Sequence, residues 1–342
     1  MVPHLLEKEN GICSGHKELR VLIEKVAQRK PTIRGFFSKN YFTDGKTIMF
    51  EYPRLTPDGE QMDSIKGDAM KKVCLILSIY LMLNAPVFAE NECFIAKENQ
   101  TIIQQEGSCS VRHSPCSTFK IAISLMGYNE GILIDATHPE YPYEKGYIDH
   151  FGPFPMDAWK QAQNPTTWIQ NSCIWYSQIV TQKIGEEKFK RYVQAFNYGN
   201  QDVSGDPGKN NGLTESWLSS SLQIAPEEQI QFIEKLVNSK LPVSLRAQEQ
   251  TRQLFYLETF SNGWKLFGKT GSGFQLNADG TQDFSHQIGW FVGWVEKDGK
   301  TMVFAQFMAD KEKMDTTAGK RNKEIAKDKL MKLLSNSSLK GA

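Results

Sequence analysis

Residues that bind metal ions are scarce in this sequence of 342 residues. Its six cysteines form no Cys-x-x-Cys pair, and its six histidines have no His-x-His or His-Glu-x-x-His spacing. Such pairs place two ligands on one ion, so their absence argues against a zinc hydrolase, and we expect no metal. Six cysteines are also too few for a disulfide scaffold in a chain of this length.

An excess of charge of either sign is absent as well. The sequence has 40 basic and 39 acidic residues and a formal net charge of +1. No overall field would attract the chain to nucleic acid or to anionic lipid, and we expect neither as a partner. Because 40% of the residues are apolar, the chain can bury a substantial core. A small molecule or a peptide is therefore the expected partner.

Long apolar runs are rare, and the most informative one is short. It follows Met70 and two lysines, covers residues 73–83 and ends in Asn84-Ala-Pro-Val-Phe-Ala89. A basic start, a short apolar centre and small residues before the cleavage point are typical of a secretory signal peptide, here residues 70–89. A buried helix or an uncleaved anchor is the alternative interpretation, although the run is shorter than the ~20 residues that a span needs.

Residues 1–69 precede this signal, although a signal normally stands at the N-terminus. The simplest interpretation is that translation starts at Met70 and that the region is an artefact of the chosen start codon. If it is translated, we expect a polar extension outside the fold, because its one amphipathic piece, residues 19–26, is too short for a domain. Residues 90–342 would form one exported globular domain, periplasmic or secreted, with no membrane attachment after cleavage.

Export would allow cysteine pairs to persist in an oxidising compartment. Cys93 and Cys109 flank a predicted hairpin that turns at Glu98-Asn99. A disulfide between the two cysteines is therefore a candidate, although strict hairpin register would place Cys93 nearer Gln104 than Cys109.

The rest of the domain alternates between helical and strand-like segments. Helices are predicted at residues 118–128 and from Pro226 to Leu236. Strand-like runs follow at residues 263–269, 287–295 and 301–308, and a basic amphipathic helix closes the chain. Because strands stand at both ends with helices between them, we expect the terminal strands to share one antiparallel sheet.

A serine followed by a lysine three residues later occurs at Ser14, Ser117 and Ser337, about as often as chance predicts. Context distinguishes Ser117, because Ser117-Thr-Phe-Lys120 opens an apolar helical run. Residues i and i+3 lie on one face of a helix, so a lysine held neutral could take the proton of the serine hydroxyl. Ser117 and Lys120 are therefore the predicted nucleophile and base.

Lys269-Thr-Gly271 is a second element, which occurs once, at the end of a strand-like run and before Ser272. A strand edge with a cation and a hydroxyl can align an amide of a substrate and bind its carboxylate. Taken alone, the triplet could equally be a strand that ends in a turn. Ser172-Cys-Ile174 lies between the two elements and has no meaning in isolation.

The order Ser-x-x-Lys, Ser-x-x and Lys-Thr-Gly is that of the penicillin-recognising serine enzymes. Four segments resemble the signatures of class D, or oxacillinase-type, β-lactamases, namely Ser117-Thr-Phe-Lys120, Ser172-Cys-Ile174, Tyr198-Gly-Asn200 and Lys269-Thr-Gly271. The resemblance covers about residues 93–334 and includes Trp217. It implies an α/β three-layer fold with a mostly antiparallel sheet, flanking helices and a helical subdomain. It also implies hydrolysis of β-lactam antibiotics, which gives resistance.

The resemblance further implies how the residues would act. Ser117 would form an acyl-enzyme. The sequence has no Glu-x-x-Leu-Asn segment, so the hydrolytic water would be activated by Lys120 carrying a carboxyl group from carbon dioxide, after burial near Ile174 has lowered the pKa of its amine. Trp217 would donate its indole N–H to this carbamate. Carbon dioxide or bicarbonate is the only expected requirement.

Other positions would bind and polarise the substrate. Ser172 would pass a proton to the leaving lactam nitrogen, while Lys269 and Thr270 bind the carboxylate of the drug. The backbone N–H groups of Ser117 and Ser272 would form the oxyanion hole.

The remaining signatures concern the walls of the site. Gly271 and Ile174 would line the substrate, with Tyr198-Gly-Asn200 as a loop beside the pocket. Many class D enzymes also have an arginine on the strand after Lys-Thr-Gly that holds the substrate carboxylate, but the corresponding residues 307–311 contain none.

Two related functions are alternatives. A β-lactam-sensing receptor domain shares the serine and the modifiable lysine but stays acylated, and its transmembrane apparatus would have only residues 73–83 available. A penicillin-binding transpeptidase or carboxypeptidase would carry Ser-x-Asn in place of Ser172-Cys-Ile174. Repeated turnover of a chromogenic cephalosporin separates a hydrolase from both.

Overall fold

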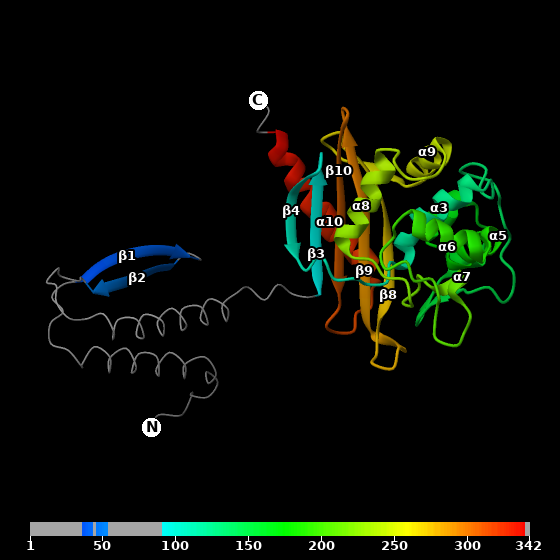
Figure 1. Cartoon of the computed structure of the whole chain (residues 1–342), viewed down its shortest axis with the longest axis horizontal. Helices are drawn as coiled ribbons and strands as arrows, with labels where there is room; N and C mark the ends of the chain where they lie inside the picture. Colours follow the sequence, from blue (N-terminus) through cyan, green and yellow to red (C-terminus); the bar gives the residue numbers. More distant parts are fainter. Residues whose placement is uncertain (1–35, 44–45, 54–90, 339–342) are drawn as a thin grey trace, which may run out of the picture. The chain divides into compact units, whose positions relative to one another are not determined.

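The computed structural model describes residues 36–43, 46–53 and 91–338 (Figure 1). Contacts between residues divide the chain into two compact units, Met1–Ala85 and Pro86–Ala342. The predicted signal peptide at residues 70–89 and the amphipathic piece at residues 19–26 lie outside the described residues.

The first unit contains an unexpected hairpin. Strand β1 (Phe36–Thr43) pairs antiparallel with β2 (Lys46–Pro53). Both strands are rich in aromatic and β-branched residues, and the sequence between them, Asp44-Gly45, is typical of two-residue hairpin turns. The sequence analysis did not predict this hairpin.

The second unit is built on a six-stranded sheet with the order β4-β3-β10-β9-β8-β7, in which every pair is antiparallel. Its strands are β3 (Glu92–Glu98), β4 (Thr101–Gly107), β7 (Tyr256–Thr259), β8 (Lys265–Leu276), β9 (Gln282–Lys297) and β10 (Lys300–Ala309). The pairing of β3 with β10 confirms that the terminal strands share one sheet. A separate short pair is formed by β5 (His150–Phe151) and β6 (Phe154–Pro155).

Helices cover both faces of this sheet (Figure 1). Helix α10 (Ala318–Ser338) lies on one face and buries Ala326 and Leu330 against the strands. Helix α8 (Pro226–Val237) lies on the other face, beside a helical subdomain. The remaining helices are η1 (Cys116–Phe119), α3 (Lys120–Asn129), η2 (Asp157–Lys160), α4 (Pro165–Asn171), α5 (Ile174–Ile184), α6 (Glu186–Ala195), α7 (Gly212–Glu215) and α9 (Leu245–Leu254). The predicted three-layer fold is confirmed.

The pattern of β10 shows how one strand serves two cores. Met302 and Phe304 belong to the core under α10, whereas Val303, Ala305 and Phe307 belong to the core under α8 and the subdomain. Successive side chains of a strand point to opposite faces, and here both faces are covered. The strand therefore appears in the sequence as an almost continuous apolar run.

Helix α8 begins where the sequence predicts. Pro226 occupies its first turn, and the carboxylate of Glu228 accepts a hydrogen bond of 2.9 Å from the backbone N–H of Ala225. Across the described part of the chain, no helix combines the length and the apolar character required to cross a bilayer.

Strand β8 is longer than predicted. It was expected to end at Lys269, but it continues to Leu276 and pairs with β9 throughout. The ladder with β9 holds Gly271 and Gly273 in the strand, so tertiary pairing overrides the low strand propensity of glycine. Lys269-Thr-Gly271 therefore lies inside the strand, and its predicted position at the strand end is wrong.

The hairpin of β3 and β4 also differs in register. Its turn lies one residue later than predicted, at Asn99-Gln100, which both have positive φ, and a bulge interrupts the pairing. These two shifts move the partner of Cys93 from the predicted Gln104 to Gly107.

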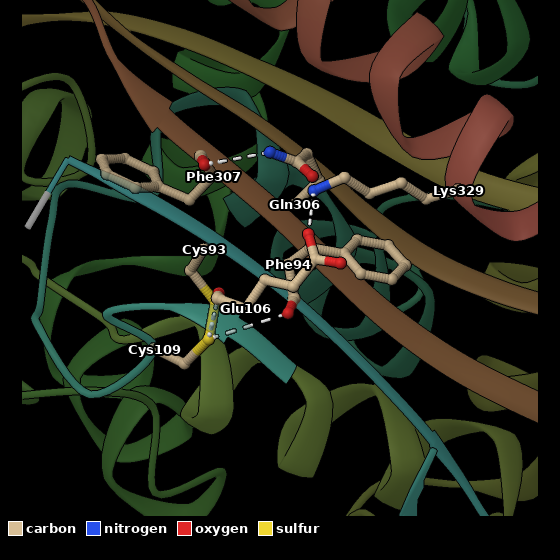
Figure 2. The surroundings of a disulfide bond; sticks show 7 residues. All are labelled: Cys93, Phe94, Glu106, Cys109, Gln306, Phe307 and Lys329. Carbon is tan, nitrogen blue, oxygen red and sulfur yellow. Dashed lines mark hydrogen bonds and ion pairs between the residues drawn. A yellow bond between two sulfur atoms is a disulfide. The ribbon is translucent and has the colours of Figure 1, made fainter. Parts of the chain in front are cut away.

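The shifted register brings the two cysteines together. Cys93 on β3 and Cys109, which follows β4, form a disulfide with a Cα–Cα distance of 5.1 Å (Figure 2). Glu106 of the same edge strand accepts a hydrogen bond of 2.7 Å from Lys329 of α10, and this contact lowers the pKa of the carboxyl group. Edge strand β4 is thus tied both to β3 and to α10.

Candidate active site

Ser117 lies in a tight turn ahead of the helix that was predicted to carry it. The 3₁₀ helix η1 contains Cys116 and Ser117, and α3 begins only at Lys120. Side chains three residues apart eclipse one another in a 3₁₀ turn, so this geometry still brings the predicted pair together. Lys120 Nζ donates a hydrogen bond of 3.1 Å to Ser117 Oγ.

Lys120 has no access to solvent, with an exposed fraction of 0%. This burial lowers the pKa of its amine to about 8, while the neighbouring Cys173 and Cys116 thiols act in the opposite direction. No carboxylate within the described ranges forms an ion pair with it. Ile174, which was expected to lie near the lysine, is buried at the start of α5. Burial therefore favours the neutral amine, which becomes the main form above a pH of about 8.

Ser172 stands at the junction of two helices. It ends α4 with a left-handed backbone, φ 55°, a conformation that is unfavourable for a residue other than glycine and is often found at functional sites. Asn164 and Thr167 fix the start of the same helix through reciprocal side-chain and backbone hydrogen bonds. The hydroxyl of Ser172 accepts a hydrogen bond of 2.9 Å from Lys269 Nζ.

Lys269 reaches this serine from β8. Burial lowers the pKa of its amine well below the ordinary value, and the positive charges of Lys120 and Lys323 lower it further. Its Nζ is also 3.3 Å from the hydroxyl of Thr270. Lys269 and Thr270 thus form one polar cluster with Ser172, next to the pair of Ser117 and Lys120.

Two glycines allow the nucleophile turn to approach β8. A Cβ atom at Gly271 would be 2.9 Å from the carbonyl oxygen of Pro115, and one at Gly273 would be 2.4 Å from Cys116 Sγ. Only residues without side chains fit these positions while η1 keeps its place. Gly271 therefore contributes to the site because its missing side chain leaves room for the turn that carries Ser117.

The outer edge of β8 is open beside this cluster. Strand β7 pairs with β8 only as far as Phe267. The N–H groups of Gly268 and Phe274 point outward, to Phe255 O and Ser219 Oγ. Backbone N–H groups alternate in direction along a strand, so the N–H of Ser272 points to the same open edge.

The Ser272 side chain points elsewhere, because its hydroxyl accepts a hydrogen bond of 2.9 Å from the backbone N–H of Gly319 in α10. Ser272 thus offers its backbone, and not its hydroxyl, to the open edge of β8. The predicted oxyanion hole would use this backbone N–H.

Trp217 is buried with its indole N–H unused. Its Nε1 has no hydrogen-bond partner among the described residues, and its ring packs against Phe119 and Phe189. A buried donor without a partner lowers the stability of the fold by roughly 1–3 kcal/mol. An acceptor that formed a hydrogen bond with this N–H would therefore be stabilised here.

The loop signature Tyr198-Gly-Asn200 supports the segments around the site. Tyr198 is buried and packs against Phe119, while a Cβ atom at Gly199 would be 1.9 Å from the carbonyl oxygen of Gln223. Asn200 Nδ2 donates a hydrogen bond of 2.8 Å to the carbonyl oxygen of Ser221. The signature fixes the segment after Trp217 and lies behind the nucleophile turn.

Sequence reasoning missed the two serines that connect these parts. Ser114 Oγ donates to the carbonyl oxygen of Trp217 and accepts from the N–H of Ser219, at 2.8 and 2.9 Å. Ser219 in turn binds the N–H of Phe274 on β8. Isolated serines carry no sequence signal, so their role became visible only in the fold.

A cavity of about 630 Å³ opens beside Lys269 and Thr270, and Ser117 does not line it. Lys320 and Lys323 of α10 also line it. Residues 307–311, which correspond to the stretch that contains an arginine in many class D enzymes, lie at the end of β10.

In that segment, Ala309 pairs with Ile288, and Asp310 binds Arg321 at 2.5 Å. Helix α10 covers that side of β8.

Fold and geometry together define a class of protein. A serine paired with a buried lysine, a second serine bound to a strand lysine, and an open strand edge are the parts of the penicillin-recognising serine enzymes. Residues 79–331 also match the family of penicillin-binding protein transpeptidase domains.

Comparison with known proteins specifies the family. The chain is 38% identical to β-lactamase OXA-9 of Klebsiella pneumoniae over 78% of its own length and 100% of the relative. It is 44% identical to β-lactamase OXA-1 of Escherichia coli, covering 64% and 77% of the two chains. The solved class D β-lactamase OXA-427 is 38% identical, with a TM-score of 0.67 over 72% of this chain and 99% of that structure. The chain belongs to the class D serine β-lactamases.

Proposed function

We propose that this enzyme hydrolyses β-lactams through an acyl-enzyme on Ser117, with Lys120 as the base after carboxylation by carbon dioxide. Hydrolysis of β-lactams, and the resistance that it gives, follow from membership of the family. One observation carries the finer proposal. A lysine that is completely buried, and that has no carboxylate partner among the described residues, contacts the predicted nucleophile at 3.1 Å.

Carboxylation suits the surroundings of Lys120. A neutral amine adds carbon dioxide and releases one proton, which leaves an anionic carbamate. The amine is neutral above a pKa of about 8. The anion would be attracted to the positive charge of Lys269. It would also accept a hydrogen bond from the indole N–H of Trp217, which has no other partner among the described residues. Both features support an anion at this position.

Acylation follows from the positions of the hydroxyl groups. Carboxylated Lys120 takes the proton of Ser117, whose Oγ attacks the lactam carbonyl. The N–H groups of Ser117 and Ser272 stabilise the oxyanion, a contribution of about 3 kcal/mol for each donor. Ser172, held by Lys269, passes a proton to the lactam nitrogen as the C–N bond breaks, and the proton taken up by carboxylated Lys120 replaces it on Ser172, so that the carbamate is anionic again.

Deacylation uses the same base. Lys120 takes a proton from water, the resulting hydroxide attacks the ester of Ser117, and the proton returns to Ser117 Oγ as the product leaves. Lys269 and Thr270 hold the substrate carboxylate at the open edge of β8 during both steps.

A bicarbonate titration of the unmutated enzyme tests the role of Lys120. After incubation at mildly acidic pH, where a carbamate protonates and loses carbon dioxide, we expect turnover to fall by about 100-fold, the usual contribution of a general base. Added bicarbonate should restore it. Recovery should weaken as the pH falls below about 8, because the protonated amine of Lys120 cannot add carbon dioxide. Activity that ignores bicarbonate after acid treatment would rule out the carbamate.

Mass spectrometry tests the nucleophile separately. Ser117→Ala should form no covalent adduct with a penicillin. Ser124→Ala, which removes a buried hydroxyl that donates to the carbonyl oxygen of Lys120, should still form it. An adduct on Ser117→Ala would show that another residue attacks the lactam.

A further inference from the structure

A chain of buried hydrogen bonds holds the turn that carries the nucleophile. Thr118 follows Ser117, and its hydroxyl donates a hydrogen bond of 2.7 Å to the carbonyl oxygen of Pro115. The same hydroxyl accepts a hydrogen bond of 2.9 Å from Nε2 of Gln229 on helix α8. Gln229 Oε1 in turn accepts a hydrogen bond of 3.4 Å from the hydroxyl of Tyr198. The chain therefore connects α8 and the loop signature to the nucleophile turn.

The direction of these hydrogen bonds is set by chemistry. Thr118, Gln229 and Tyr198 are each only 1% exposed, so their polar groups depend on one another and not on bulk water. The Nε2 of a glutamine donates and cannot accept, which leaves the single hydrogen of the Thr118 hydroxyl for Pro115. Gln229 thus fixes the hydroxyl of Thr118 in the orientation that binds the carbonyl oxygen of Pro115.

The carbonyl of Pro115 lies where the nucleophile turn meets β8. A Cβ atom at Gly271 would be 2.9 Å from its oxygen, so the turn and the strand are in close contact. Cys116, between Pro115 and Ser117, has a left-handed backbone with φ 50°, which is unfavourable for a residue other than glycine. A backbone in this conformation persists only where surrounding contacts hold it.

We propose that Gln229 is a positioning residue for acylation, which acts through the hydroxyl of Thr118 on the carbonyl of Pro115 and so places Ser117 against β8. Attack on a carbonyl needs the nucleophile and the oxyanion donors in one alignment, and a displacement of about 1 Å can lower the rate by about 100-fold. The proposal rests on Ser117 as the nucleophile and does not depend on carboxylation of Lys120.

A double-mutant cycle on the rate constant of acylation by a penicillin tests this role. Gln229→Met removes the donor at a similar volume, and Thr118→Val removes the hydroxyl. Each variant should acylate about tenfold more slowly, which corresponds to about 1.4 kcal/mol, the size of one hydrogen bond. The double variant should lose no more than either single variant, because both changes break the same chain. Thr118→Ser keeps the hydroxyl and should react nearly as fast as the unmutated enzyme.

Gln248→Met is the matched control. Gln248 is also a glutamine that is 1% exposed, and its side chain binds the backbone of Leu241 and Val243 on a different segment. Both glutamine variants should lower Tm, but Gln248→Met should leave the acylation rate unchanged. This comparison separates positioning of the nucleophile from a general loss of stability.

The measurements use saturating bicarbonate and temperatures well below Tm, and mass spectrometry locates the penicillin adduct. An unchanged acylation rate in Gln229→Met, or losses that add in the double variant, would overturn the positioning role alone. An adduct on a residue other than Ser117 in the unmutated enzyme would refute the nucleophile and this proposal together.

Discussion

Two buried amines dominate the chemistry of individual residues in this enzyme. Lys120 and Lys269 are both removed from water, and the charge of Lys120 lowers the pKa of Lys269 further. Two desolvated cations that repel each other are unfavourable in a folded protein. A carboxyl group on Lys120 would replace this repulsion by attraction, so the modification would help the fold as well as the reaction.

The indole N–H of Trp217 should stabilise the carbamate of Lys120, and its removal tests this role. Trp217→Phe keeps an aromatic ring against Phe119 and Phe189 but removes the N–H. A hydrogen bond to a charged acceptor contributes roughly 1.5–3 kcal/mol, so the bicarbonate concentration for half-maximal activity should rise by about tenfold or more. A bicarbonate titration of kcat measures it.

Trp294→Phe is the control, because Trp294 is also fully buried with an indole N–H that lacks a partner in the described residues. Its bicarbonate requirement should equal that of the unmutated enzyme. Equal requirements in Trp217→Phe and the unmutated enzyme would mean that Trp217 does not bind the carbamate.

Among the elements, β8 organises the site and the β3–β4 hairpin secures the far edge of the sheet. β8 offers an open edge because β7 is short, and its glycines admit η1. The hairpin occupies the opposite end of the strand order, with β10 and β9 between it and β8. Changes to the hairpin should therefore affect stability more than catalysis.

The disulfide of that hairpin tests this separation. Replacing Cys93 and Cys109 together by serine opens a loop with a sequence separation of 16 residues, which should lower the free energy of unfolding by about 3 kcal/mol. Tm should fall by roughly 6–12 °C in a domain of this size. The kcat at 25 °C should be nearly unchanged. Thermal melting with and without reductant measures the effect.

Reductant should lower the Tm of the unmutated enzyme to that of the double variant and leave the variant itself unaffected. If the variant melts like the oxidised enzyme, the bridge does not stabilise this domain.

The molecule as a whole consists of the β-lactamase unit and a smaller unit that precedes it. The relative OXA-9 is matched over 100% of its length by 78% of this chain, which supports a catalytic unit that does not need every residue of the sequence. We propose that residues 70–89 export residues 90–342 to the periplasm and that residues 1–69 are dispensable.

Expression from Met70 tests this organisation. The shortened chain should show full periplasmic hydrolysis of a chromogenic cephalosporin, and N-terminal sequencing of the mature protein should begin at Glu90. A second chain that starts at Glu90, behind an added methionine, should stay inside the cell. Loss of periplasmic activity from the Met70 chain would mean that residues 1–69 contribute to export or folding.

The sequence by itself determined the class of enzyme and the outline of the fold. Ser117-Thr-Phe-Lys120 and Lys269-Thr-Gly271 are local patterns, and reactive residue types keep their spacing whatever surrounds them. The late strands and the start of α8 at Pro226 also follow from apolar patterns and capping residues. Such signals act within a few residues, so they can be interpreted without tertiary structure.

Tertiary structure alone decided the environment of those residues. The low pKa of Lys120 depends on desolvation by neighbours from several elements, and the contact of Ser172 with Lys269 joins residues 97 positions apart. The same holds for the register that joins Cys93 to Cys109. Desolvation, register and proximity arise from contacts between distant segments, and no local pattern of residues encodes them.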